Sequence, residues 1–300
     1  MKKETKNVAL VLSGGGARGL AHIGVIEELV KRGYNITSIA GTSIGSVIGG
    51  VYAVGKMDEY KEWVTNLSKL DVFKLMDFAV TKGGLIKGEK IFREMGKIIG
   101  NAKIEELAIP FAAIAVDIEN HKEVVFTSGS LTDAIRASVA IPTVITPVKY
   151  KNTYLVDGGV LAPLPLDYVK RSGNDILVAV NLNADLPYRR SKKNKPSEKE
   201  EKNYKKTIDY INKHWSKFFK TTKEKHAGYF DLMNKSLYAM QIRLTEIAIK
   251  QNKPDILIPI SRRSCEIFEF YRSEEMIEYG RRQAVKMLKE FTVPVSPHRT

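Results

Sequence analysis

The stretch IAGTSIGS, residues 39–46, contains the motif G-x-S-x-G with Ser43 at its centre. An apolar run at residues 36–40 precedes the motif and predicts a short buried strand, and small residues at 46–54 predict the helix that follows. A serine at the apex of a strand, a sharp turn and a helix is typical of a nucleophile elbow, in which glycines permit close backbone packing and a strained serine. Taken alone, the motif is more often a plain Gly/Ser turn, so its interpretation depends on the rest of the chain.

A glycine-rich loop lies one strand earlier in the chain. The apolar run Val8–Leu12 predicts a central parallel strand that is covered on both faces, and it leads directly into SGGGARG at residues 13–19. A helical pattern at residues 20–30 follows, and Gly33 suits the end of that helix. Residues 8–40 therefore predict a strand–helix–strand unit, which places the glycine loop and the serine turn at the same end of adjacent parallel strands.

Two functions fit this glycine loop. Gly14-x-Gly16-x-x-Gly19 matches the fingerprint of a dinucleotide-binding fold, which makes a nucleotide-binding oxidoreductase one alternative. That fold holds the ribose with an acidic residue at the end of the second strand, whereas here the second strand ends in the elbow, without Asp or Glu. Backbone N–H groups of such a loop also make an anion hole, and in acyl transfer the anion is the oxygen of the tetrahedral intermediate. This second use fits better and requires no cofactor.

The composition predicts a globular protein of the cytoplasm. The chain has 300 residues, of which 43% are hydrophobic, an ordinary share for a globular protein. No apolar run approaches the roughly 20 residues that span a bilayer, and the apolar run near the N-terminus is too short for a signal peptide. The single cysteine, Cys265, excludes an internal disulfide, and we expect it to be a small buried hydrophobe.

A serine hydroxyl needs a base, and the histidines of this chain are poorly placed to supply one. The five histidines are His22, His121, His214, His226 and His298. None of them follows a late strand, where an α/β-hydrolase triad has its histidine. The best-placed base is Asp157, which ends a predicted strand and precedes Gly158 and Gly159. A Ser–Asp dyad requires a carboxylate whose pKa is raised by desolvation, although Asp-Gly-Gly at a strand end is often only a turn.

Four blocks of sequence resemble, in this order, those of the bacterial patatin-like phospholipase family. They are SGGGARG at 13–19, GTSIG at 41–45, ASVAIP at 137–142 and DGG at 157–159. Any one block is weak evidence, but four in this order and spacing are specific, and the resemblance extends over residues 7–183. It implies an α/β three-layer sandwich with a central, mostly parallel sheet and helices on both faces. It also implies a serine hydrolase that cleaves acyl esters of (lyso)phospholipids or related lipids.

The same resemblance implies roles for individual residues. Ser43 is the implied nucleophile and Asp157 the implied base, without a metal ion. The implied oxyanion hole is lined by backbone N–H groups of the glycine loop and of the elbow: Gly14, Gly15, Gly16 and Ile44. Residues that support the motifs are Arg18, Gly19, Gly41, Gly45, Gly158 and Gly159. Ile44 and Gly159 stand where the family often has alanine, and we expect Arg18 to steady the loop rather than to meet a lipid phosphate.

Periodicity predicts the remaining elements of a single domain. Predicted helices cover residues 58–70, 89–99, 131–138, 229–249 and 265–291. Predicted strands cover residues 111–116 and 124–126, which form a hairpin, and residues 154–156, 176–180 and 256–260. Asp117, Glu119 and His121 alternate at the hairpin turn, where a solvated strand end is a far better interpretation than a metal site. We divide the domain into a catalytic core at 7–183, a basic insertion at 186–225 and a C-terminal part at 226–291 that completes it.

The net charge of +14 is concentrated in one segment. Residues 189–225 contain 14 Lys and Arg against 5 Asp and Glu, a net charge of +9. Within this segment Lys205–Lys220 predicts a basic amphipathic helix with aromatic residues, which would bind an anionic membrane surface or pack its apolar face on the core. Nucleic acid is not an expected partner, because no nucleic-acid-binding motif accompanies the charge. A non-catalytic, membrane-associated adaptor on the same scaffold is a further alternative to the enzyme.

Overall fold

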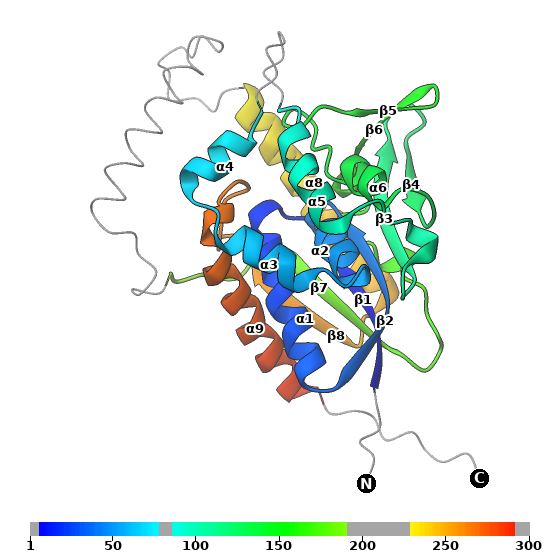
Figure 1. Cartoon of the computed structure of the whole chain (residues 1–300). Helices are drawn as coiled ribbons and strands as arrows, with labels where there is room; N and C mark the ends of the chain where they lie inside the picture. The colour runs from blue at the N-terminus through cyan, green and yellow to red at the C-terminus, as the bar shows by residue number, and fades with distance from the viewer. Residues whose placement is uncertain (1–5, 78–85, 191–228, 292–300) are drawn as a thin grey trace, which may run out of the picture.

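The computed structural model describes residues 6–77, 86–190 and 229–291 (Figure 1). Within these ranges one eight-stranded sheet carries helices on both faces, which confirms the predicted α/β class. The strands are β1 (Lys6–Leu12), β2 (Tyr34–Thr42), β3 (Phe111–Asp117), β4 (Lys122–Phe126), β5 (Val148–Tyr150), β6 (Thr153–Asp157), β7 (Ile176–Ala184) and β8 (Ile256–Ser261). The helices are α1 (Ala21–Lys31), α2 (Ile44–Ala53), α3 (Met57–Thr65), α4 (Lys69–Leu75), α5 (Glu89–Ile99), α6 (Leu131–Ser138), α8 (Tyr229–Asn252) and α9 (Ser273–Glu290).

The sheet is mostly parallel, as predicted. Its order is β5-β6-β3-β2-β1-β7-β8, and β4 also pairs with β3. The central pairs β3–β2, β2–β1, β1–β7 and β7–β8 are parallel. The pairs that involve β4, β5 and β6 are antiparallel and lie at one end of the sheet. Because β6 is antiparallel to β3 and β2 is parallel to it, β6 and β2 run in opposite directions.

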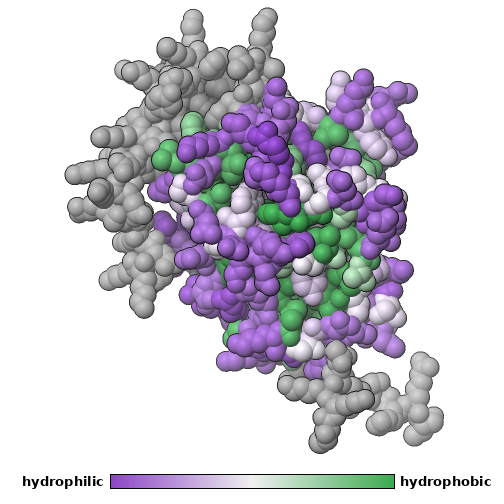
Figure 2. Space-filling view, viewed as in Figure 1, coloured by the Kyte–Doolittle hydropathy of each residue, from purple (hydrophilic) through white to green (hydrophobic). Residues whose placement is uncertain are grey.

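Alternate side chains of β1 enter two different hydrophobic clusters, which is what a near-continuous apolar strand predicts. Val8, Leu10 and Leu12 belong to the cluster that includes residues of α1, α2 and α9. Ala9 and Val11 belong to the cluster on the opposite face, against which residues of α8 pack. Helices therefore cover both faces of the sheet, with α1 and α9 on the near side in Figure 1. The outward sides of these near helices carry mostly hydrophilic side chains (Figure 2).

Two predicted helices differ from the observed ones, and one observed strand was not predicted. The helix predicted at 58–70 is two helices, because Ser68 begins α4 with a capping box in which Ser68 and Asp71 each bond the other's backbone N–H. The helix predicted at 265–291 begins only at Ser273; residues 265–272 are a turn and a short 3₁₀ helix instead. Cys265 lies in that turn and is buried, as expected. The short strand β5 was missed by the periodicity.

The register of the sheet brings the ends of β2 and β6 together. β2 runs parallel to β3, and its last residue, Thr42, lies opposite Ile114. β6 runs antiparallel to β3, and its last residue, Asp157, lies opposite Ala115. β4 pairs with Ala113–Asp117 along one edge of β3. β2 and β6 therefore both pair along the opposite edge of β3, where their C-terminal ends meet. Ser43, the residue after Thr42, is therefore placed beside Asp157.

Some predictions concern residues that the structure does not describe. Lys205–Lys220 and most of the basic insertion at 186–225 lie outside the described residues. The division into a core at 7–183, this insertion and a C-terminal part at 226–291 stays a prediction, although β8 joins the same sheet as β1. In the part of the chain that the structure describes, no helix combines the length and the apolar character that crossing a bilayer needs.

Candidate active site

Ser43 occupies a sharp turn between β2 and α2. Its backbone is strained, with φ of 55° and ψ of −126°, a conformation that costs free energy for a residue with a side chain. The turn is also crowded, since a Cβ on Gly41 would overlap the carbonyl of Gly45 and a Cβ on Gly45 would overlap the carbonyl of Leu12. Glycine at both positions is therefore what lets the two segments pass, as expected for a nucleophile elbow.

Ser138, at the end of α6, holds this turn in place. The backbone N–H of Ser43 donates to Ser138 Oγ at 2.9 Å, and Ser138 Oγ donates to the carbonyl of Ile114 at 2.6 Å. The side chain of Ser138 is fully buried, so no water replaces these bonds. The sequence singled out the block at 137–142 but gave Ser138 no role, because nothing in a short helix indicates which distant amide its hydroxyl will meet.

We predict that Ser138→Ala leaves the buried backbone amide of Ser43 without an acceptor. The free energy of unfolding should fall by about 1–3 kcal/mol, and kcat for the reaction at Ser43 should fall about tenfold. KM should change little, since Ser138 does not line the cavity beside Ser43. Steady-state kinetics and urea denaturation measure both effects. Ser38→Ala is the matched control: Ser38 is also buried and its hydroxyl also donates to a carbonyl, but it lies in the middle of β2, away from the turn. An equal loss of kcat in both variants would contradict this role of Ser138.

Asp157 lies in direct contact with Ser43. Ser43 Oγ donates to Asp157 Oδ2 at 2.5 Å, and the backbone N–H of Gly159 donates to Asp157 Oδ1 at 2.7 Å. The carboxyl group is buried, and burial raises its pKa to about 6 even though both hydrogen bonds act to lower it. The carboxylate is thus charged at neutral pH yet more basic than an ordinary aspartate. Gly158 follows it where a Cβ would overlap the carbonyl of Ile114.

The three amides of the glycine loop, those of Gly14, Gly15 and Gly16, differ in their hydrogen bonding. The N–H of Gly14 donates to the carbonyl of Pro163 at 3.0 Å, so the prediction that Gly14 is an oxyanion donor is wrong for this conformation. The amides of Gly15, Gly16 and Ile44 have no hydrogen-bond acceptor among the described residues. Gly16 and Ile44 also line the same cavity as Ser43.

Arg18 supports the glycine loop from behind. The guanidinium is buried and donates to the carbonyls of Leu182 at 3.2 Å and Cys265 at 3.1 Å. It also donates to Asn183 Oδ1 at 3.3 Å and to Tyr238 Oη at 3.1 Å, which joins the loop to β7 and α8. The expected structural role of Arg18 fits these contacts. Gly19, the last glycine of the loop, lies where a Cβ would overlap the side chain of Ile44.

His22 also supports the loop and is not a base for Ser43. Its ring is fully buried, and Nε2–H donates to the carbonyl of Ser13 at 3.0 Å. Burial lowers its pKa to about 4, so the imidazole is neutral at physiological pH. Among the described residues no group of three or more His, Cys, Asp or Glu side chains is arranged to hold a metal ion.

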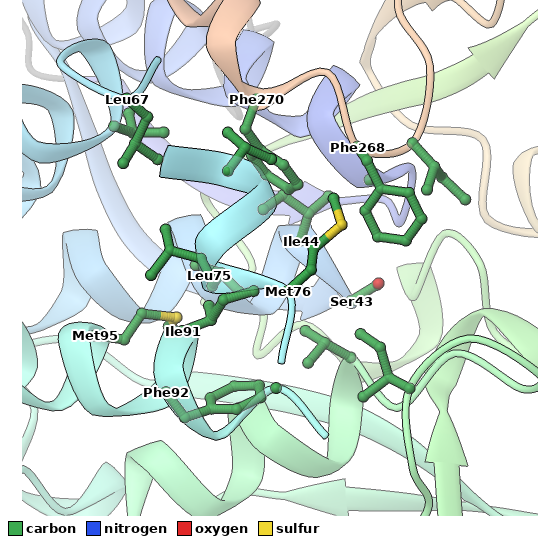
Figure 3. A pocket seen from close by; sticks show the side chains of 18 of the residues that line it. Ser43, Ile44, Leu67, Leu75, Met76, Ile91, Phe92, Met95, Phe268 and Phe270 are labelled. Carbon is green, nitrogen blue, oxygen red and sulfur yellow. The ribbon is translucent and has the colours of Figure 1, made fainter. Parts of the chain in front are cut away.

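An apolar cavity of about 110 Å³ opens beside Ser43 (Figure 3). Its walls come from α3, α4, α5 and the turn before α9, with side chains such as Val64, Leu75, Met95 and Phe268. In Figure 3, Ser43 lies at one side of the cavity and Met95 at the other. Apart from Ser43 the walls are almost entirely hydrocarbon and aromatic, which suits a long apolar group attached to the reacting carbonyl.

The chain is similar to known proteins along almost its whole length. The family model described as patatin-like phospholipase matches residues 10–170. An uncharacterized NTE family protein of Mycobacterium tuberculosis is 33% identical over a 332-residue alignment, which covers 95% of this chain and 92% of the relative. Lysophospholipase NTE1 of Debaryomyces hansenii is 32% identical over 185 residues, 59% of this chain and 12% of that protein. The crystal structure of VipD from Legionella pneumophila aligns with a TM-score of 0.48 and 14% identity, over 96% of this chain and 67% of that one.

These similarities do not favour the nucleotide-binding and adaptor alternatives. The family model covers more than half of the chain and includes the glycine loop, the elbow and the Asp157 turn. The mycobacterial relative is similar from end to end. The chain therefore belongs to the bacterial patatin-like phospholipase family and is an ester hydrolase of the phospholipase type.

Proposed function

We propose that this enzyme hydrolyses acyl esters of lysophospholipids or related lipids through a dyad of Ser43 and Asp157. The observation that carries the proposal is the 2.5 Å hydrogen bond from Ser43 Oγ to Asp157 Oδ2 at the side of an apolar cavity. The strained backbone of Ser43 points to the same conclusion, because strain at one residue is typical of functional sites. In this proposal the cavity holds one acyl chain, and the ester carbonyl lies against Ser43.

The reaction starts with transfer of the Ser43 proton to Asp157 as Oγ bonds to the carbonyl carbon. The carbonyl oxygen takes up the negative charge and accepts hydrogen bonds from the amides of Gly15, Gly16 and Ile44. In such a site one oxyanion donor is worth about 3 kcal/mol of barrier. Because the donors are backbone amides, the bulk of the Ile44 side chain does not affect this function.

Collapse of the intermediate breaks the ester C–O bond, and Asp157 returns the proton to the leaving alcohol oxygen. The acyl group stays on Ser43 Oγ. Water then attacks the acyl carbon and gives a proton to Asp157, and the second collapse returns that proton to Ser43 Oγ and releases the fatty acid. The raised pKa of Asp157 suits this double use, since a carboxylate near pKa 6 both accepts and returns a proton more easily than an ordinary one.

The direct test is a panel of lipid substrates with product identification by mass spectrometry. We expect the wild-type enzyme to release free fatty acid from lysophospholipids, and Ser43→Ala to release none above background. Labelling with ¹⁸O water distinguishes hydrolysis, which places one ¹⁸O in the released fatty acid, from acyl transfer to another alcohol, which incorporates none. Fatty acid release by Ser43→Ala at the wild-type rate would disprove the proposal.

We also propose that the enzyme works at an anionic membrane surface and reaches it through the basic stretch Lys205–Lys220. The support is the net charge of +9 over residues 189–225 together with the aromatic residues inside it. We expect the protein to co-sediment with vesicles that contain phosphatidylglycerol and to be released by salt, because salt screens such attraction. Equal binding to neutral phosphatidylcholine vesicles would contradict the electrostatic part.

A further inference from the structure

Helix α8 crosses the site with two polar side chains one turn apart, Tyr238 and Gln241. Residues three apart lie on the same face of a helix. Tyr238 Oη accepts a hydrogen bond from Arg18, behind the glycine loop. Gln241 lies against Gly159, in the turn that carries Asp157. One face of α8 therefore reaches both the proposed oxyanion loop and the proposed base.

The side-chain amide of Gln241 occupies the space that an alanine at position 159 would fill. A Cβ built on Gly159 would lie 2.9 Å from Gln241 Nε2 and 3.0 Å from Asp157 Oδ1. The side-chain amide of Gln241 and the carboxylate of Asp157 thus lie on either side of the position that a methyl group at residue 159 would occupy. Glycine at 159, noted in the sequence as a departure from the family pattern, is what leaves room for the Gln241 side chain.

Gln241 lies outside the apolar cavity. That cavity is lined by Ser43 and Ile44 but not by Gln241. In the proposed reaction the acyl chain fills the cavity, so the alcohol half of the ester must lie outside it. The leaving oxygen must also come within reach of Asp157, which protonates it. The half-buried amide of Gln241 is the polar group next to Asp157 on this side, and it has no hydrogen-bond partner among the described residues.

We propose that Gln241 binds the polar alcohol half of the substrate, a glycerol-type alcohol with a hydroxyl or phosphate oxygen next to the cleaved ester. A carboxamide has two N–H donors and one acceptor oxygen, so it can hydrogen-bond to a hydroxyl or to a phosphate oxygen. This inference rests on the proposed function, since it takes Ser43 and Asp157 as the reacting pair. It adds a recognition site for the leaving group and names Gly159 as the residue that makes space for it.

The test compares two substrates with the same acyl chain. One is a lysophosphatidylcholine, whose leaving group is a glycerol derivative, and the other is a p-nitrophenyl ester, whose leaving group has no hydroxyl beside the ester. We expect Gln241→Leu to lower the ratio of kcat/KM for the lysolipid to kcat/KM for the aryl ester about fivefold, the effect of one lost hydrogen bond. Gly159→Ala should lower the same ratio, because its methyl group displaces the amide. The double variant should match Gln241→Leu alone.

The control is Met240→Ala, next to Gln241 in sequence but 54% exposed on the outer side of α8. It should leave the ratio unchanged. An unchanged ratio in Gln241→Leu, including an equal loss on both substrates, would overturn the inference and indicate a merely structural side chain. Failure of the proposed function gives a different result, because the wild-type enzyme would then turn over neither ester by a route that needs Ser43.

Discussion

Replacing Asp157 by asparagine is expected to abolish ester hydrolysis and, at neutral pH, to stabilise the fold. An asparagine side chain cannot take the proton of Ser43, and loss of such a base costs on the order of 10⁴-fold in kcat. Its shape is otherwise the same, so its oxygen still accepts the hydrogen bond that Gly159 donates to Asp157. Turnover of a short-chain ester measures the first effect.

The gain in stability follows from the sign of the pKa shift. The folded-state pKa of Asp157, about 6, lies above the ordinary value of 3.8. The folded state therefore holds its proton more tightly, and the resulting stability is complete below pH 3.8 and lost as pH rises through 6. Above pH 6 the fold must bury a charge, at a cost of about 3 kcal/mol. The asparagine side chain of the variant carries no charge, so urea denaturation at pH 8 should show a more stable protein, with a difference that shrinks as pH falls to about 4.

The activity of the wild-type enzyme should follow the same titration. We expect kcat/KM to fall about tenfold per pH unit below pH 6, because protonated Asp157 cannot accept the Ser43 proton. Asp185→Asn is the control for both measurements, since its carboxylate is 59% exposed and pairs with Arg262 and Arg263 at the surface. A wild-type rate in Asp157→Asn, or lower stability than wild type at pH 8, would contradict the assigned burial and role of Asp157.

Gly45→Ala is expected to lower both the stability and the activity of the enzyme. A Cβ on Gly45 would overlap the backbone carbonyls of Leu12 and Ser13, which belong to β1 and the start of the glycine loop. Neither is a flexible side-chain end, so the elbow or the loop must shift. Forcing extra atoms into a packed core costs about 1–3 kcal/mol, and backbone obstacles place this variant at the upper end. Activity should fall by at least about 10²-fold, since small displacements of reacting groups are costly.

Gly96→Ala is the matched control for that substitution. Gly96 lies in α5 with no atom near its missing Cβ, and alanine is favoured over glycine inside a helix by about 1 kcal/mol. Thermal unfolding should therefore show a gain in Gly96→Ala and a loss in Gly45→Ala. A Gly45→Ala protein with wild-type melting temperature and activity would show that the elbow does not need this close approach.

Local patterns predicted the elements that build the site. The elbow, the glycine loop and the Asp157 turn could be predicted because each stands at the end of an apolar strand. Asp157 could be predicted as the base because no histidine follows a late strand, and in the structure its carboxylate contacts Ser43. The break between α3 and α4 was not predicted, although Ser68 and Asp71 have the spacing of a capping box.

Tertiary contacts explain what the sequence could not predict. Nothing in the sequence distinguishes the amide of Gly14 from those of Gly15 and Gly16 as an oxyanion donor. In the folded chain the carbonyl of Pro163 accepts the hydrogen bond of the Gly14 amide. The role of Ser138 depends on which amide its hydroxyl meets, and Gln241 reaches the site from a helix far along the chain from Asp157. In the segment before α9, Ile267 and Phe270 have the three-residue spacing of a helix, but in the structure both line the cavity.

The role of Ser43 as a nucleophile activated by Asp157 is tested most directly by reaction with a fluorophosphonate probe, followed by peptide mapping of the adduct by mass spectrometry. We predict one adduct, on Ser43, in the wild-type protein, and labelling slowed by at least about 10²-fold in Asp157→Asn. An adduct on another residue, or labelling of Asp157→Asn at the wild-type rate, would contradict this claim.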